Sequence, residues 1–120
     1  PSKHFATLIA RLPRRHSSLI FQLRTGHAPL NKHLNRISKA PSPKCPRCTR
    51  NETTHHFLIA CPAYARHRIV LVDEIGTRAH ELKYLLNHPD CIKPTLKFIA
   101  KTRRLETIFG DVTPPPDEED

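Results

Sequence analysis

The sequence predicts a mainly α-helical fold for this chain of 120 residues. Apolar residues recur chiefly three and four positions apart, which is the period of a helix with one buried face, and alternating strand patterns are scarce. Twelve prolines divide the chain into short segments, because proline seldom lies inside a helix. Its length suits one small domain. We therefore expect about five to seven short helices in one domain.

Three helices are predicted in the first third of the chain. The first begins at Ser2 as N-cap and ends at Pro13. The second covers about 17–24 and closes at Gly26, where a helix end favours a left-handed residue. The third runs from about Pro29 to residue 37, since proline suits a first turn. Their expected inward residues are Phe5, Leu8, Ile9, Leu12, Leu19, Ile20, Leu23, Leu30, Leu34 and Ile37.

Further helices are predicted over about 54–60, 62–75, 79–87 and 94–109, two of them beginning at a proline. Residues 87–90 read as a turn. Residues 1–110 thus form the expected helical domain, with a loop over 44–62. Residues 111–120 are acidic and proline-rich, and we expect this tail to be disordered.

The most specific motif lies in that loop and has the spacing C-x2-C-x7-H-x4-C, formed by Cys45, Cys48, His56 and Cys61. Three thiolates and one imidazole suit a tetrahedral zinc ion. Four protein ligands also leave no position for an activated water, so we expect one structural Zn²⁺. The second ring nitrogen of the histidine is expected to donate to Glu52 or to a nearby carbonyl.

Alternatives remain open at this motif. His55 is adjacent to His56, and its H-x5-C spacing would also allow metal binding. The four cysteines could instead form two disulfides in one of three connectivities. No secretory signal opens the chain, which favours a reducing, intracellular compartment. Cys91, thirty residues beyond Cys61, is expected to be a partly buried free thiol.

The charge is strongly basic and unevenly placed. Residues 1–51 contain eleven Lys or Arg and no acid, and Glu52 is the first acidic residue. Residues 1–110 hold twenty basic and six acidic side chains, a net charge of +14. Such a body attracts polyanions, and RNA or DNA is the expected partner; a basic domain without a defined partner is the alternative. No apolar run approaches the roughly eighteen residues of a membrane span.

Arginine forks match phosphate oxygens, so the basic residues before and within the loop are candidates for phosphate contacts. The same side chains could instead be solvated helix faces, and Arg24 with His27 could brace the turn at Gly26 against the metal loop. Lys101, Arg103 and Arg104 form a second, weaker basic patch. The residues that we nominate for nucleic-acid binding are Arg14, Arg15, Arg24, Lys44, Arg47 and Arg50.

Two strings flank the metal ligands: Leu-Arg-Thr-Gly-His-Ala-Pro-Leu-Asn at 23–31 and Glu-Thr-x-x-His-Phe-Leu-x-x-Cys-Pro at 52–62. Together they resemble the zinc-binding segment at the C-terminal end of non-LTR retrotransposon reverse transcriptase polyproteins. Fungal versions, in which this segment follows an RNase H domain, are the most similar. The resemblance covers about 3–112 and implies the same four ligands and nucleic-acid engagement beside the polymerase.

Retroviral zinc knuckles share the H-x4-C spacing but have a shorter gap before the histidine. Knuckles stack exposed bases on aromatic side chains, and here Phe57 and Tyr64 are the only candidates; Phe57 is expected in the core instead. The chain shows no converging carboxylates of the kind that RNase H chemistry needs. We therefore expect a non-catalytic accessory domain that binds nucleic acid.

The alternative is a zinc-stabilised protein-interaction domain that docks on a neighbouring RNase H or polymerase domain in cis. The apolar stripe Phe5, Leu8, Ile9 and Leu12 would then be an interface.

Overall fold

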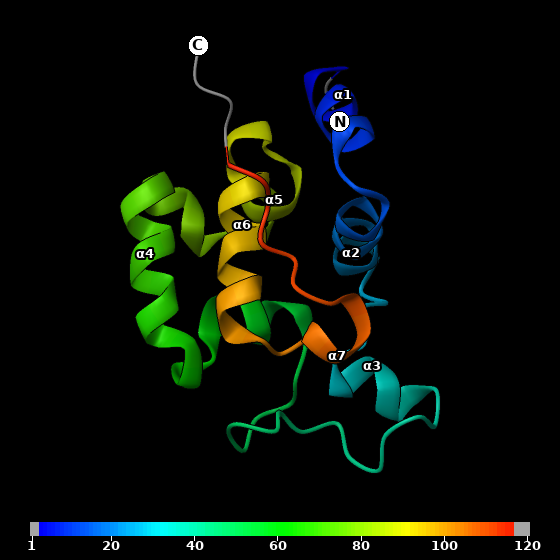
Figure 1. The fold of residues 1–120 in the computed structure, drawn as a ribbon. Coiled ribbons are helices and arrows are strands. Elements are labelled where there is room, and N and C mark those ends of the chain that lie inside the picture. The colour runs from blue at the N-terminus through cyan, green and yellow to red at the C-terminus, as the bar shows by residue number, and fades with distance from the viewer. Residues whose placement is uncertain (1–2, 117–120) are drawn as a thin grey trace.

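The computed structural model describes residues 3–116 and is mainly helical, as the sequence predicts (Figure 1). Within these residues no strand forms, and the pairing of Lys44 with Asn51 is an isolated bridge. No helix in this part of the chain is both long and apolar enough to cross a membrane.

Three helices open the fold: α1 (Lys3–Arg11), α2 (Arg14–Thr25) and α3 (Asn31–Arg36). The expected N-cap Ser2 lies outside the described residues. α2 begins earlier than expected because the carbonyl of Pro13 accepts bonds from the next turn. Gly26 ends α2 in the left-handed region at φ 78°, which confirms the prediction at that position.

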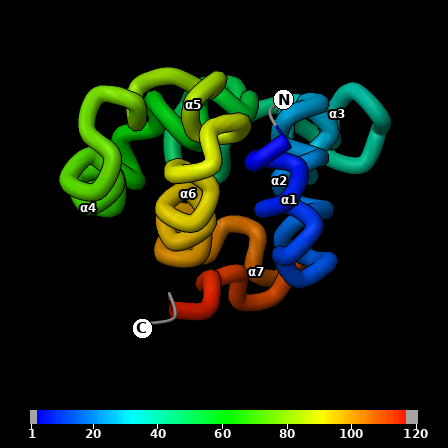
Figure 2. The backbone as a smooth tube through the Cα atoms, turned by 90° about the horizontal axis from the view of Figure 1, so that it is seen from above, coloured from blue at the N-terminus to red at the C-terminus, as the bar shows by residue number. Residues whose placement is uncertain are grey.

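After the metal loop come a π-helical turn, η1 (His56–Ala60), a 3₁₀ turn, η2 (Pro62–Tyr64), and α4 (Ala65–Ile75). A second 3₁₀ turn, η3 (Gly76–His80), leads to α5 (Leu82–Asn87). α6 (Pro89–Thr102) lies at the centre of the molecule, with α4 and α5 packed against it and α1 and α2 on its other side (Figures 1 and 2).

The last predicted helix, 94–109, is wrong at its start and is broken near its end. α6 begins at Pro89, because the ring of His88 accepts a bond from the Asp90 N–H and proline suits the first turn. It ends at Thr102, whose hydroxyl bonds to the carbonyl of Ile99 and accepts from the N–H of Arg104. Arg103 then turns left-handed at φ 56°, and α7 (Glu106–Phe109) follows.

The core gathers apolar side chains from nearly every helix. Phe57 is fully buried and meets Tyr64 edge-to-face at 5.6 Å between ring centroids. Its burial confirms the core interpretation, and Tyr64 is buried as well, so neither ring is free to stack a base. The largest fully buried side chains are Phe57, Leu19, Ile20, Leu23, Leu30, Leu58, Leu71, Leu85, Ile92, Leu96, Ile99 and Leu105.

Two expectations about the chain ends need correction. Phe5 and Leu12 are buried in the core, so the stripe on α1 is not a free interface. The segment expected to be a disordered tail from residue 111 packs at its start, because Val112 and Pro114 are buried. Residues 117–120 of that tail lie outside the described part of the chain.

Candidate metal centre

One cluster in the described residues could hold a metal ion, and it comprises Cys45, Cys48, His56 and Cys61. One donor atom from each lies within 4.8 Å of all the others. The Cys45 and Cys61 sulfurs are 3.9 Å apart, and the Cys48 sulfur is 3.2 Å from Nε2 of His56. A tetrahedral zinc ion separates such donors by about 3.5 to 3.8 Å, so the arrangement fits this ion.

Backbone hydrogen bonds shape the loop that holds the first two cysteines. The N–H of Cys45 donates to the carbonyl of Arg50, which closes the loop on itself. The N–H of Arg47 points at the Cys45 sulfur, 3.4 Å away. The side-chain amide of Asn31, at the start of α3, donates to the carbonyl of Lys44 and ties the loop to that helix.

The π-helical turn explains how His56 and Cys61, five residues apart, face the same point. On a regular α-helix two such residues would point in different directions. In η1 the N–H of Cys61 donates to the carbonyl of His56 at 2.7 Å, the i→i+5 bond of a π-helix. The wider turn places Cys61 on the same side of the helix as His56. The helix then ends at Cys61, whose backbone is extended, as predicted.

His56, not His55, joins the cluster. His56 is 5 % exposed and its N–H is held by the hydroxyl of Thr53, whereas His55 is exposed on the outer side of the turn. Burial lowers the pKa of His56, which favours the neutral imidazole that a metal requires. The expected bond from its ring to Glu52 is absent, because Glu52 has other partners.

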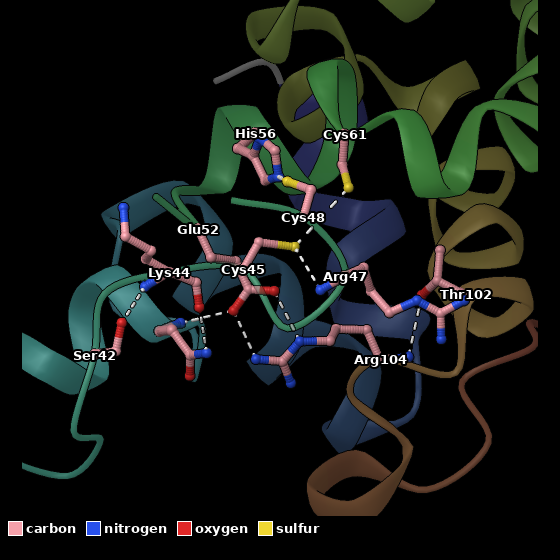
Figure 3. Close-up of polar contacts among 11 residues, drawn as sticks. Ser42, Lys44, Cys45, Arg47, Cys48, Glu52, His56, Cys61, Thr102 and Arg104 are labelled. Carbon is pink, nitrogen blue, oxygen red and sulfur yellow. Dashed lines mark hydrogen bonds and ion pairs between the residues drawn. The ribbon is translucent and has the colours of Figure 1, made fainter. Parts of the chain in front are cut away.

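Those partners are Arg104 and Asn31. Nε and Nη2 of Arg104 lie 2.8 and 2.6 Å from the two carboxylate oxygens of Glu52, which is fully buried (Figure 3). The backbone N–H of Asn31 adds a third bond, 2.7 Å from Oε1. Although burial opposes the charge of Arg104, the bonds to Glu52 raise its pKa. Glu52 therefore joins the metal loop to α3 and to the α6–α7 turn.

Arg68 of α4 holds the other side of the centre. Its guanidinium donates to three carbonyls around the η1 turn, those of Phe57, Leu58 and Cys61, at 2.9–3.3 Å. The same group lies 5.4 Å above the ring of Phe98. These bonds give donors to the carbonyls of Phe57 and Leu58, and they add a second donor to that of Cys61, which also accepts from the N–H of Tyr64.

Burial favours the neutral thiol at Cys45 and at Cys91, whose pKa values it raises. Desolvation raises the pKa of Cys45 to about 11, so a metal must displace a proton to bind there. All four cysteines are free, and Cys91 is buried in α6 away from the cluster. The structure therefore contains no disulfide among these four cysteines. Cys91 is a free thiol, as predicted, but it is fully buried and not partly buried.

The nominated phosphate-binding residues are all exposed, but they divide into two groups. Three belong to α2 and three to the metal loop. Arg24 has an internal contact, since its guanidinium lies 5.0 Å over the ring of Phe5. The nearby ring of His27 meets His33 of α3 at 5.0 Å. This turn thus contacts α1 and α3 instead of bracing the metal loop.

Sequence reasoning missed the supporting arginines. Arg68 follows the motif by seven residues, and the sequence predicts no role for it. The sequence places Arg104 with Lys101 and Arg103 in a second basic patch, whereas its guanidinium binds the buried Glu52. The sequence did contain a sign that Glu52 has a basic partner such as Arg104. Glu52 is the single acidic residue between residue 1 and residue 72. A lone carboxylate in such a segment requires a cationic partner if it is buried.

Comparison with known proteins finds one retroelement. The chain is 34 % identical over 67 residues to the retrovirus-related Pol polyprotein from type-1 retrotransposable element R1 4 of Nasonia vitripennis. The match covers 54 % of this chain and 17 % of the polyprotein, so the chain spans a small part of that relative. No family model and no solved structure matches. The similarity supports a retrotransposon-related origin.

Proposed function

We propose that the chain is a zinc-stabilised, non-catalytic domain that binds nucleic acid as an accessory to a retrotransposon-derived reverse transcriptase. The proposal rests on the three cysteine sulfurs and the histidine nitrogen, which all lie within 4.8 Å of one another. The similarity to a Pol polyprotein supplies the setting. No step of chemistry is assigned to the metal, because four ligands complete its coordination.

Zinc is the ion that best suits these donors. Thiolates and imidazole favour Zn²⁺, whereas Ca²⁺ and Mg²⁺ prefer oxygen ligands. Three thiolates, a neutral imidazole and Zn²⁺ carry a net charge of −1. Arg68 and Arg104 are partly buried beside the cysteines, and each interacts electrostatically with one of them, Cys61 and Cys45 respectively. Such cations stabilise an anionic centre.

Nucleic acid is the partner that the charge supports. Residues 1–110 carry a net charge of +14, and the six nominated cations are exposed. Phosphate neutralisation by such residues releases counterions and makes binding strongly dependent on salt.

A protein partner in cis is the second candidate. Ile69 and Val70, adjacent on α4, are 63 % and 52 % exposed and present a small aliphatic surface to solvent. An RNase H or polymerase domain could cover them. This docking would be resistant to salt, in contrast to binding of an oligonucleotide.

Two measurements on the reduced protein test the proposal. Native mass spectrometry and metal analysis should find one zinc per chain, which Cys45→Ser should abolish. Fluorescence anisotropy with a labelled 12-nucleotide RNA and the DNA of the same sequence should give affinity that falls steeply between 50 and 200 mM salt. Protein that carries no metal would refute the zinc site. Zinc-loaded protein without affinity for either oligonucleotide would refute nucleic-acid binding.

A further inference from the structure

A cleft beside the metal loop brings together arginines from two distant parts of the chain. Its volume is about 550 Å³, and it lies between the loop and the α6–α7 turn. Arg47 comes from the loop, and Arg103 and Arg104 come from the turn. Tyr64 and Thr107 also line the cleft, and Glu106 is the one carboxylate among the lining residues.

Two of these arginines form ion pairs, one with a buried and one with a partly exposed carboxylate. Arg104 is bound through Nε and Nη2 to the buried Glu52, and Arg103 is bound through the same two atoms to Glu106 at 3.0 and 2.8 Å. Each pair leaves the remaining terminal nitrogen of the guanidinium without a bond among the described residues. Arg104, held by its buried partner, therefore orders one wall of the cleft before any ligand binds.

Arg47 is the arginine of the cleft that forms no ion pair in the described part of the chain. Its side chain is exposed and extends from the loop towards Thr102 (Figure 3). Its position is tied to the metal, because Arg47 lies between two ligands and its N–H faces the Cys45 sulfur. The metal therefore orders one wall of the cleft, while Glu52, in the same loop, anchors the other through Arg104.

We propose that this cleft binds a phosphate of a single-stranded nucleic-acid backbone, with Arg47, Arg103 and Thr107 as its contacts. The inference rests on the proposed function and assigns to it one site, which joins Arg47 of the nominated residues to Arg103 of the second basic patch. Planar guanidinium groups converging on one space match phosphate oxygens, and a nearby threonine hydroxyl supplies a further donor. Backbone contacts of this kind carry no sequence preference.

The test compares charge removal inside and outside the cleft. Arg47→Gln/Arg103→Gln is measured against Arg11→Gln/Arg36→Gln, a pair of exposed arginines on α1 and α3 that do not line the cleft. Anisotropy with a labelled 12-nucleotide RNA is recorded at 50, 100 and 200 mM NaCl. Loss of the contact with this one phosphate should reduce the salt slope by about 0.7. At 100 mM NaCl the cleft pair should lose at least about tenfold in affinity and the control pair less than about threefold.

Equal losses from the two pairs would refute the cleft and leave the proposed function standing, whereas absence of binding by the unaltered protein would refute both. Competition by a poly-glutamate peptide as strong as that by unlabelled RNA would also overturn the choice of phosphate. Melting curves check the fold of each variant. If the cleft pair fails to fold, Thr107→Glu places a carboxylate in the cleft without disturbing either ion pair, and it should weaken binding to a similar extent.

Discussion

Arg104 and Glu52, fifty-two positions apart in the chain, form a two-pronged ion pair whose carboxylate is completely excluded from solvent. The pair closes the fold around the metal loop. Its carboxylate belongs to the loop, and its guanidinium belongs to the turn that ends α6. Loop, α3 and C-terminal turn are thereby linked through one side chain, since Asn31 also donates to Glu52.

Removal of Arg104 should destabilise the domain strongly. Arg104→Ala leaves the Glu52 carboxylate buried without its counter-charge, which costs about 3–5 kcal/mol for such pairs. The free energy of unfolding from urea titration of the zinc-loaded protein measures this loss. Arg103→Ala is the matched control, because its partner Glu106 is 40 % exposed and the pair should contribute little. A loss for Arg104→Ala no larger than that of the control would contradict a structural role.

Substitutions of Glu52 and Arg104 should not be additive in their effect on the free energy of unfolding. Glu52→Gln/Arg104→Met removes both charges, so its cost should be clearly smaller than the sum of the single costs. Additive costs would mean that the two residues act separately.

Replacement of Arg68 should loosen the metal centre from the other side. Arg68→Met removes the donor to the carbonyls of Phe57 and Leu58 and one of the two donors to that of Cys61. A hydrogen bond to a charged group contributes about 1.5–3 kcal/mol. We expect a loss of about 2–3 kcal/mol in stability and faster release of zinc to a chelator. Arg66→Met, exposed on the same helix, should change neither quantity. Unchanged zinc release by Arg68→Met would show that the η1 turn holds its shape without this arginine.

The two adjacent histidines should differ sharply in metal binding. His56→Ala removes a ligand, and we expect zinc affinity to fall by more than the ~10–100-fold seen when a residue bonded to a ligand is lost. His55→Ala should retain one zinc per chain in native mass spectrometry. His56→Cys should bind zinc again, because four thiolates also form a tetrahedral site. Loss of zinc by His55→Ala alone would reverse the assignment.

The cluster of three cysteines and His56 could be predicted from sequence, because its members lie within seventeen residues and their spacing is typical of a metal-binding loop. The π-helical turn was not predictable in the same way, since helix periodicity does not distinguish an inserted i→i+5 bond. The ends of α6 were missed because local side-chain bonds decided them: His88 set the start, and Thr102 competed for the backbone at the end.

The supporting arginines were missed for a different reason. Arg68 binds carbonyls seven to eleven positions away, and Arg104 binds a carboxylate fifty-two positions away. No local pattern separates either of them from exposed arginines. Only the folded arrangement reveals that their charges are directed inwards.

His16 on α2 is a buried polar residue of another kind. Its side chain is 1 % exposed, and neither ring nitrogen has a hydrogen-bond partner in the described part of the chain. Burial, followed by the charge of Arg15, lowers its pKa below the usual 6.5, while Asp111 partly opposes this shift. The folded protein therefore keeps His16 neutral at a pH where the unfolded chain takes up a proton.

This difference makes His16 a source of acid sensitivity. Above pH 6.5 neither state is protonated there and no penalty arises. As the pH falls below 6.5 towards the lowered pKa, the unfolded state binds the proton first and stability declines. His16→Phe should reduce the loss of unfolding free energy between pH 7.0 and 5.5 by up to about 1 kcal/mol. Urea titrations at the two pH values measure it. His4→Phe, exposed on α1, is the control, and an equal effect from both variants would show that burial of His16 is not the cause.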